Sequence, residues 1–176
     1  RPCRCPCLVP PADEAVPFVG EDSALIVSPP GLGKTTLLRE LIRRYASGIG
    51  LPRMYRVAVA DERGELAAMR MGLPTLDVGL CCDVMDGCAK SEAIPRLIRA
   101  MSPEIVATDE LGGRQDARCV AEAMRCGVRV FATAHAKSAS QLSGRDGWER
   151  LLGPDGFEKL IVLGEAPGKI VRMERL

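Results

Sequence analysis

The sequence has 176 residues, with 24 lysines and arginines against 23 aspartates and glutamates, and 47% of its residues are hydrophobic. This length fits one compact domain that can bury a core without disulfides. A net charge of +1 argues against nucleic-acid binding through bulk charge, and an aromatic content of 3% argues against stacking on single strands. No nucleic-acid partner is therefore expected.

The first residues are rich in proline and contain Cys3, Cys5 and Cys7 in a C-x-C-x-C cluster. Three thiolates are one ligand short of a closed zinc site. Because proline-rich termini are commonly disordered, we expect a disordered tail over residues 1–20 and a folded domain over residues 21–176. The sequence has no run of roughly 20 apolar residues that would span a bilayer, so a cytoplasmic protein is expected.

From residue 21 onward, short apolar runs alternate with segments whose leucines and isoleucines recur at a spacing of three or four residues. The expected strands are 24–27, 57–60, 105–108 and 128–134. The expected helices are 34–46, 91–101 and 116–126. Residues 69–90 show no clear period and are expected to form a structured loop. Residues 160–163 and 170–173 are expected to form a terminal strand pair. This alternation favours a mainly parallel sheet with helices on both faces.

Four polar clusters follow four of these strands, at residues 28–36, 61–65, 109–110 and 135. In parallel sheets, ligands bind beyond the carboxyl ends of the strands. We therefore expect the four clusters to meet along one edge of the sheet.

The first cluster reads Ser28-Pro-Pro-Gly-Leu-Gly-Lys-Thr35, which matches the phosphate-loop pattern G-x-x-x-x-G-K-[ST] with Ser28 in place of the first glycine. Gly31 and Gly33 allow backbone N–H groups to turn toward a phosphate, Lys34 can reach the β- and γ-phosphates, and Thr35 can bind Mg²⁺. ATP and Mg²⁺ are the expected cofactors. The expected fold class is α/β, a P-loop NTPase with a RecA-like sheet. The residues expected to bind the nucleotide are Ser28, Pro29, Pro30, Gly31, Leu32, Gly33, Lys34, Thr35 and Thr36.

Two acidic clusters end neighbouring strands. Asp109-Glu110 has the Walker B form, in which Asp109 would hold Mg²⁺ together with Thr35 and Glu110 would deprotonate the attacking water. The other cluster, Asp61-Glu-Arg-Gly-Glu65, would repel the first unless a cation joined them, so we expect a role near magnesium or water and a catalytic Glu65. A solvated acidic turn is the alternative for each cluster.

Two further residues are candidates on position alone. His135 ends the strand Ala-Thr-Ala-His, where it would contact the γ-phosphate; the alternative is a core or surface histidine. Arg114 is a candidate phosphate contact across a subunit boundary, and a surface arginine is the equally open alternative.

On these residues the chain resembles the stage III sporulation protein AA family of endospore-forming bacteria. The segments that carry the resemblance are LIVSPPGLGKTTLLREL (25–41), VADERGELA (59–67), DVGLCCDVMDGCAK (77–90), LIRAMSPEIVATDELG (97–112) and GVRVFATAHA (127–136). That family is similar to the secretion ATPases, and the resemblance implies their four sequence boxes here. The Walker A, acidic, Walker B and histidine boxes would be Ser28–Thr36, Asp61–Glu65, Ile105–Glu110 and Thr133–His135.

The resemblance implies an ATPase that assembles as a homo-oligomeric ring, a hexamer. Its partners would be membrane channel proteins of the sporulation complex, and it would lie on the cytoplasmic side of a channel between mother cell and forespore, peripheral to the membrane. The sequence departs from the family where Cys81-Cys82 replaces an expected arginine-bearing segment, which would remove a phosphate contact.

The function expected is therefore a Mg²⁺-dependent, ATP-hydrolysing motor domain of a sporulation-associated secretion or channel complex. An ATP-binding ring subunit with little turnover, acting structurally, is the alternative that Cys81-Cys82 favours. A small-molecule kinase would use the same phosphate loop, but Glu110 adjoins Asp109 as a water-activating residue would, and no arginine-rich lid is evident.

Overall fold

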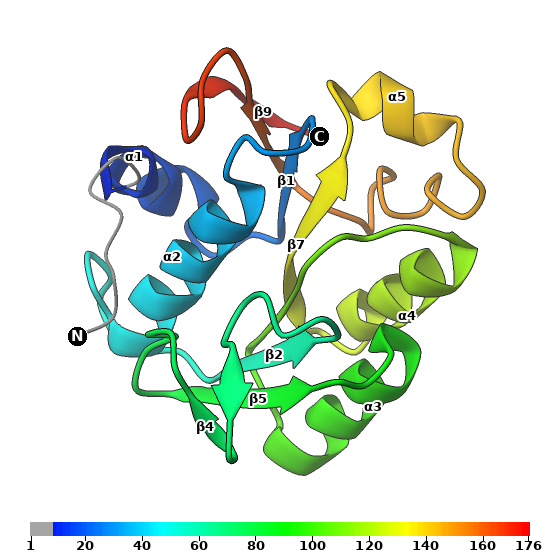
Figure 1. Ribbon diagram of the computed structural model, residues 1–176. Coiled ribbons are helices and arrows are strands. Elements are labelled where there is room, and N and C mark those ends of the chain that lie inside the picture. The colour runs from blue at the N-terminus through cyan, green and yellow to red at the C-terminus, as the bar shows by residue number, and fades with distance from the viewer. Residues whose placement is uncertain (1–8) are drawn as a thin grey trace.

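The computed structural model describes residues 9–176, and a seven-stranded sheet forms the centre of this part of the chain (Figure 1). The strands lie in the order β5 (Cys82–Asp86), β2 (Val57–Asp61), β6 (Ile105–Thr108), β7 (Arg129–His135), β1 (Ala24–Ser28), β8 (Lys159–Leu163) and β9 (Ile170–Arg175). The first six run parallel, and β9 pairs antiparallel with β8 at one edge.

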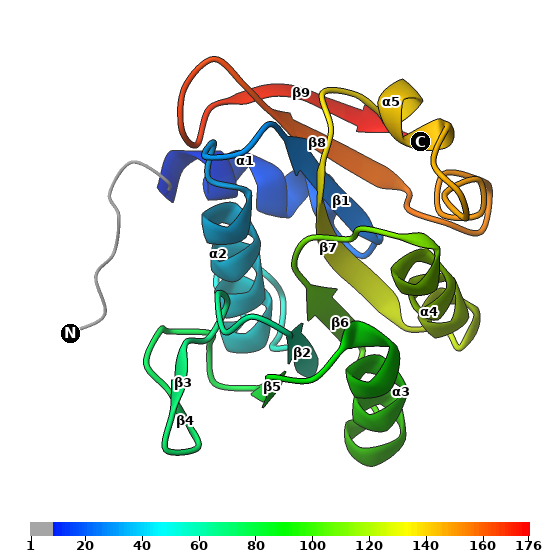
Figure 2. The ribbon, with the colours of Figure 1, turned by 45° about the vertical axis from the view of Figure 1, so that its right-hand side comes forward.

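Helices cover both faces of the sheet. Figure 2 shows α1 (Val9–Val19) and α2 (Lys34–Ser47) on one side, and α3 (Lys90–Met101) and α4 (Arg114–Arg125) on the other. The strands β1, β2, β6 and β8 are buried along their whole length, as their continuous apolar runs predict. Alternate residues of each strand face opposite helical layers, so Leu25 and Val27 belong to one core and Ala24 and Ile26 to the other.

The helix α2 follows the phosphate loop directly and packs into the core. It begins after Gly33, whose φ of 87° is left-handed and therefore suits glycine, and it ends at Gly48, with φ of 67°. Between them, Leu37, Leu38, Leu41, Ile42 and Tyr45 are fully buried at the spacing of one helical face. Packing along this face fixes the direction in which the N-terminus of α2 points.

The expected disorder over residues 1–20 is wrong for residues 9–19, which form α1. Its apolar side chains recur at helical spacing and are buried against α2 and β8. Those side chains are Ala12, Ala15, Val16 and Val19. Two of the prolines that suggested disorder, Pro10 and Pro11, fall in the first turn of the helix, where proline is tolerated, and Pro17 lies inside the helix. The cluster Cys3, Cys5 and Cys7 lies outside the described residues.

The expected loop at residues 69–90 is also wrong, since it contains three strands. A short antiparallel hairpin pairs β3 (Met69–Arg70) with β4 (Leu73–Pro74), and β5 pairs parallel with β2. Because β5 is an edge strand, it is only partly buried and contains Asp83 and Asp86, so it lacks the continuous apolar run of a central strand. A five-residue helix, α5 (Ala139–Ser143), was not expected either.

The other expected strands and helices are confirmed with ends that differ by at most two residues. The largest shifts are in α4, which starts at residue 114 rather than 116, and in β9, which ends at residue 175 rather than 173. In residues 9–176, none of the helices combines the length and apolar character needed to cross a membrane.

Candidate functional site

A chain of side-chain contacts joins the four polar clusters at the carboxyl edge of the sheet. Lys34 Nζ lies 3.1 Å from His135 Nδ1, His135 Nε2 lies 3.0 Å from Glu110 Oε1, and Arg63 Nη1 lies 2.5 Å from Glu110 Oε2. These contacts follow from the strand register, which pairs Ser28 at the end of β1 with His135 at the end of β7. The structure therefore brings together Lys34, Arg63, Glu110 and His135.

The phosphate loop is held in a turn between β1 and α2. Gly31 and Gly33 have φ of 78° and 87°, a backbone conformation that side chains other than glycine rarely adopt. The buried Ser28 hydroxyl donates to the Pro29 carbonyl at 2.7 Å, which explains why a small polar residue fits where the motif usually has glycine. From outside the loop, the Gly168 N–H donates to the Leu32 carbonyl at 2.9 Å.

The remaining residues expected to bind the nucleotide surround this turn. Pro30 is exposed at its outer side, and Thr35 and Thr36 are half-buried in the first turn of α2. A helix N-terminus attracts anions because its first N–H groups lack partners within the helix. Loop and helix together form a backbone arrangement suited to phosphate.

Lys34 is buried beneath the loop, with 5% of its surface exposed. Its ammonium donates to His135 Nδ1 and, at 3.4 Å, to the Pro29 carbonyl. Burial lowers the pKa of Lys34, while the carboxylates of Asp109, Glu110 and Glu65 act against that shift. A buried cation between a phosphate loop and several carboxylates is a group that an incoming anion would stabilise.

The contacts of His135 fix the tautomer of its ring. A lysine ammonium can only donate, so Nδ1 must accept, and a neutral ring then carries its hydrogen on Nε2 and donates it to Glu110. His135 therefore connects the lysine of the phosphate loop to the carboxylate that follows β6.

The backbone of Glu110 is strained, with a left-handed φ of 49°. Such a conformation costs about 1–3 kcal/mol in residues other than glycine and is often found at functional sites. Its N–H donates to Asp109 Oδ1 at 2.9 Å and to Thr133 Oγ1 at 2.8 Å, and these bonds hold the turn. The hydrogen bond from His135 lowers the pKa of Glu110, and the nearby charges of Arg63 and Lys34 add to this effect.

The hydrogen bonds of the Asp109 carboxylate indicate whether a cation fits at this edge of the sheet. Its Oδ1 accepts from the Thr133 hydroxyl and from the Glu110 N–H, but its buried Oδ2 has no hydrogen-bond partner within residues 9–176. An unpaired buried carboxylate oxygen is costly, and a bound cation would compensate it. In the same part of the chain, no cluster of three or more His, Cys, Asp or Glu could hold a metal by itself. Mg²⁺ commonly needs only one or two protein groups beside phosphates and waters, so the unpaired oxygen of Asp109 is compatible with its requirements.

The Asp61 carboxylate shapes the loop that follows β2. It is 2% exposed and accepts the backbone N–H groups of Glu65, Leu66 and Ala67 at 2.9, 3.1 and 2.9 Å. From α2, the Arg39 guanidinium donates to the Glu65 and Leu66 carbonyls at 2.6 and 2.7 Å. Asp61 therefore holds the backbone of the acidic cluster.

The side chain of Glu65 is exposed and makes no hydrogen bond or ion pair to another described residue. It lines a small pocket together with Asp109 and Glu110, close enough to influence the pKa of Lys34. A catalytic role for Glu65 stays a prediction.

We predict that Asp61→Ala destabilises the fold by about 3 kcal/mol, because it leaves three backbone donors without their acceptor. Urea unfolding followed by the fluorescence of the chain's single tryptophan, Trp148, measures this change. The matched control is Asp155→Ala on the surface, which should alter stability by less than about 0.5 kcal/mol. Equal stabilities for the two variants would contradict a structural role for Asp61.

Arg114 and the pair Cys81-Cys82, which the sequence analysis also singled out, lie outside the chain of contacts from Lys34 to Arg63. Arg114 begins α4 with an exposed side chain whose guanidinium lies 3.5 Å from Asp146. Burial raises the pKa of the Cys82 thiol to about 12, whereas the preceding Cys81 is exposed.

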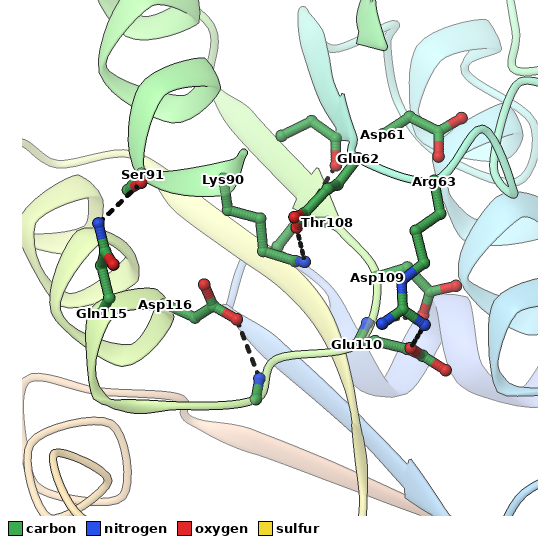
Figure 3. A network of polar contacts seen from close by, with 12 residues as sticks. Asp61, Glu62, Arg63, Lys90, Ser91, Thr108, Asp109, Glu110, Gln115 and Asp116 are labelled. Atoms are coloured by element: carbon green, nitrogen blue, oxygen red, sulfur yellow. Dashed lines mark hydrogen bonds and ion pairs between the residues drawn. The ribbon is translucent and has the colours of Figure 1, made fainter. Parts of the chain in front are cut away.

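Sequence reasoning gave no individual role to Arg63, Lys90 or Thr133, although Arg63 lies within the acidic box. Thr133 was included only as the first residue of the histidine box, and its hydroxyl proves to bind both Asp109 and the Glu110 backbone. Lys90 pairs with Glu62 at 2.6 Å beside the acidic loop (Figure 3). The charges of Arg63 and Lys90 were visible in the sequence, but their partners come from other strands and loops.

Solved structures of an ATPase and of a pilus retraction motor share this fold. The ATPase DotB of Legionella pneumophila is 15% identical with a TM-score of 0.61, over 92% of this chain and 46% of that chain. A structure titled as the pilus retraction motor PilT with bound ADP is 14% identical with a TM-score of 0.62, over 93% of this chain and 50% of that chain. The expected α/β P-loop fold is thereby confirmed.

Sequence comparison identifies the family. Stage III sporulation protein AA of Bacillus subtilis (strain 168) is 36% identical over 160 residues, which cover 89% of this chain and 52% of that protein. Protein SEEDLING PLASTID DEVELOPMENT 1 of Arabidopsis thaliana is 28% identical over 168 residues, which cover 89% of this chain and 22% of that protein. The chain thus spans about half the length of the bacterial relative and about a fifth of the plant one. Because the family profile described as "Sporulation stage III, protein AA" matches residues 12–174, the chain belongs to that family.

Proposed function

We propose that this chain is the Mg²⁺-dependent, ATP-hydrolysing motor domain of a sporulation-associated secretion or channel complex. The observation that carries the proposal is the chain of contacts from Lys34 through His135 to Glu110, beside the unpaired Oδ2 of Asp109. It joins a lysine placed to bind phosphate with a carboxylate able to accept a proton. Membership of the sporulation family and the fold shared with a pilus retraction motor support this reading.

The residues of the site suggest how the reaction would proceed. The glycine-rich turn and the N-terminus of α2 would bind the phosphates, and Lys34 would move its donor from His135 to them. Glu110 would take the proton from a water whose oxygen bonds to the γ-phosphorus, while the bond from that phosphorus to the bridging oxygen breaks. Mg²⁺, held by Asp109 and Thr35, would neutralise charge on the phosphates. His135, released by Lys34, would keep its hydrogen bond to Glu110, and Nδ1 would donate to the phosphate only after the ring has taken up a proton there.

A second candidate is an ATP-binding ring subunit with little turnover. Both oxygens of Glu110 already have partners, His135 and Arg63, and its pKa is lowered, so it is a weaker base than a free carboxylate. This observation favours slow hydrolysis. Each carboxylate oxygen has a second lone pair, however, so a water can still bind to Glu110.

We further propose that the protein assembles as a homo-oligomeric ring, a hexamer, on the cytoplasmic side of a membrane, where channel proteins of the sporulation complex would bind it. Family membership and the fold shared with secretion ATPases support this assembly.

Phosphate release from ATP by the purified protein with Mg²⁺, measured together with molar mass by light scattering, tests the proposal. We expect turnover that depends on Mg²⁺ and rises with assembly. Binding of ATP without turnover in every oligomeric state would favour the structural subunit. Transfer of phosphate to an added small-molecule acceptor would favour a kinase.

A further inference from the structure

Lys90 occupies an unfavourable position for a charged side chain. It is the first residue of α3 and is only 5% exposed, although lysines are almost never fully buried unless paired. The N-terminus of a helix also carries a partial positive charge, so a cation in the first turn is repelled. Residues that break local rules in this way often have a functional reason.

The residues around Lys90 show which negative charges its ammonium offsets. It lines the pocket at the site together with five carboxylates and one other cation, Arg63. The carboxylates are those of Asp61, Glu62, Glu65, Asp109 and Glu110. Of these, Glu62 binds Lys90 directly, with Oε2 2.6 Å from Nζ, and Glu62 is 41% exposed at its side chain. Lys90 is therefore a fixed positive charge next to carboxylates that would otherwise repel one another.

This ion pair lies next to the contact that holds the proposed catalytic base. Glu62 binds Lys90, and the following residue, Arg63, binds Glu110 (Figure 3). Arg63 is 66% exposed at its side chain, so few packing contacts restrain it. The Asp61 carboxylate holds the far end of the loop at residues 65–67. The middle of the loop is held from α3, through Lys90.

A second contact connects α3 with the segment that follows Glu110. Gln115 in α4 donates to the Ser91 hydroxyl in α3 at 3.1 Å, and Asp116 accepts the Gly112 N–H at 3.0 Å (Figure 3). The first turn of α3 thus contacts the acidic loop on one side and the start of α4 on the other. A shift of α3 would change the distance between Arg63 and Glu110.

We propose that Lys90 is a positioning residue for ATP hydrolysis: its ion pair with Glu62 fixes the loop at residues 61–67 so that Arg63 and His135 hold the Glu110 carboxylate in one orientation. The inference rests on the proposed function. Removal of the Lys90 charge frees the middle of the loop, so Glu110 loses its orientation while the phosphate loop is left unchanged.

The test compares Lys90→Met with Lys90→Arg, which keeps the charge, and with the surface control Lys137→Met. For Lys90→Met we expect kcat to fall by about 10–100-fold, since small misplacements of catalytic groups have effects of this size. The affinity for a non-hydrolysable ATP analogue should change by less than about twofold, because Lys90 does not contact the phosphate loop. Lys90→Arg should recover most of the lost kcat, and Lys137→Met should match the wild type.

The variant Glu62→Gln tests the same ion pair from its other partner, and it introduces no new side chain at the buried position of Lys90. It should lower kcat in the same way, and the double variant Lys90→Met/Glu62→Gln should be no slower than the slower single variant. Hydrogen exchange of nucleotide-free protein gives a readout apart from turnover. We expect the amides of residues 62–64 to exchange faster in Lys90→Met than in wild type.

The outcomes separate this inference from the proposed function. Wild-type kcat and wild-type exchange in Lys90→Met would overturn the positioning role while the ATPase stands. The positioning role would also be overturned if the losses of kcat in the two single variants multiplied in the double variant. A loss of affinity for the ATP analogue as large as the loss of kcat would overturn it too. Absence of turnover in the wild type would overturn the proposed function, and this inference with it.

Discussion

Lys34→Ala is expected to weaken ATP binding by about 100-fold, because it removes a charge-assisted contact to the phosphates that is worth roughly 1.5–3 kcal/mol. The effect should be at the upper end of that range. Lys34 is buried next to Asp109 and Glu110, so without its charge an incoming triphosphate would face those carboxylates unshielded.

Titration with a fluorescent ATP analogue in the presence of Mg²⁺ measures this loss. The matched control is Lys169→Ala, an exposed lysine that pairs with Glu165 on the surface, and it should bind as the wild type does. Trp148 fluorescence verifies that each variant is folded, since the indole is buried and donates to the Gly112 carbonyl at 3.3 Å. Equal affinities for the wild type and Lys34→Ala would remove the lysine from the phosphate site.

Glu110→Gln is expected to retain ATP binding and to lower hydrolysis by about 100–1000-fold, the range in which general bases contribute. Glutamine has nearly the same shape, but its amide cannot take a proton from water. The change also removes a negative charge close to Lys34, so affinity for the triphosphate should stay the same or rise slightly.

Phosphate release and analogue binding, measured on the same preparations, separate the two effects. Glu122→Gln is the matched control, since Glu122 is a half-buried residue of α4 that pairs with Arg118 and lies outside the contact chain of the site. Turnover retained in Glu110→Gln would remove Glu110 from its proposed role and would direct attention to Glu65, the other carboxylate predicted to be catalytic.

The sequence predicted those parts of the site that are formed by neighbouring residues. The phosphate loop could be identified because its glycines, Lys34 and Thr35 follow one another between a strand and a helix. The Asp109-Glu110 pair could be identified because it ends a short buried strand. Central strands were predicted because burial on both faces requires apolar residues throughout.

What the sequence could not predict depends on contacts between distant segments. Lys90 and Glu62 are separated by 28 positions, and neither charge indicates its partner. Asp61 was expected near magnesium or water, but its carboxylate binds backbone N–H groups of its own loop. The sequence did not predict α1, because its prolines are typical of a disordered terminus although its apolar side chains recur at helical spacing. It did not predict β5 either, because the aspartates of this edge strand interrupt the apolar run expected of a buried strand.

The most direct test of the central claim is a crystal structure of the protein with a non-hydrolysable ATP analogue and Mg²⁺. We predict that Lys34 leaves His135 Nδ1 and binds the terminal phosphates, with Asp109 facing the metal ion and Glu110 facing the γ-phosphorus. A nucleotide bound elsewhere, or one bound to the loop with Asp109 and Glu110 turned away from its phosphates, would contradict the account.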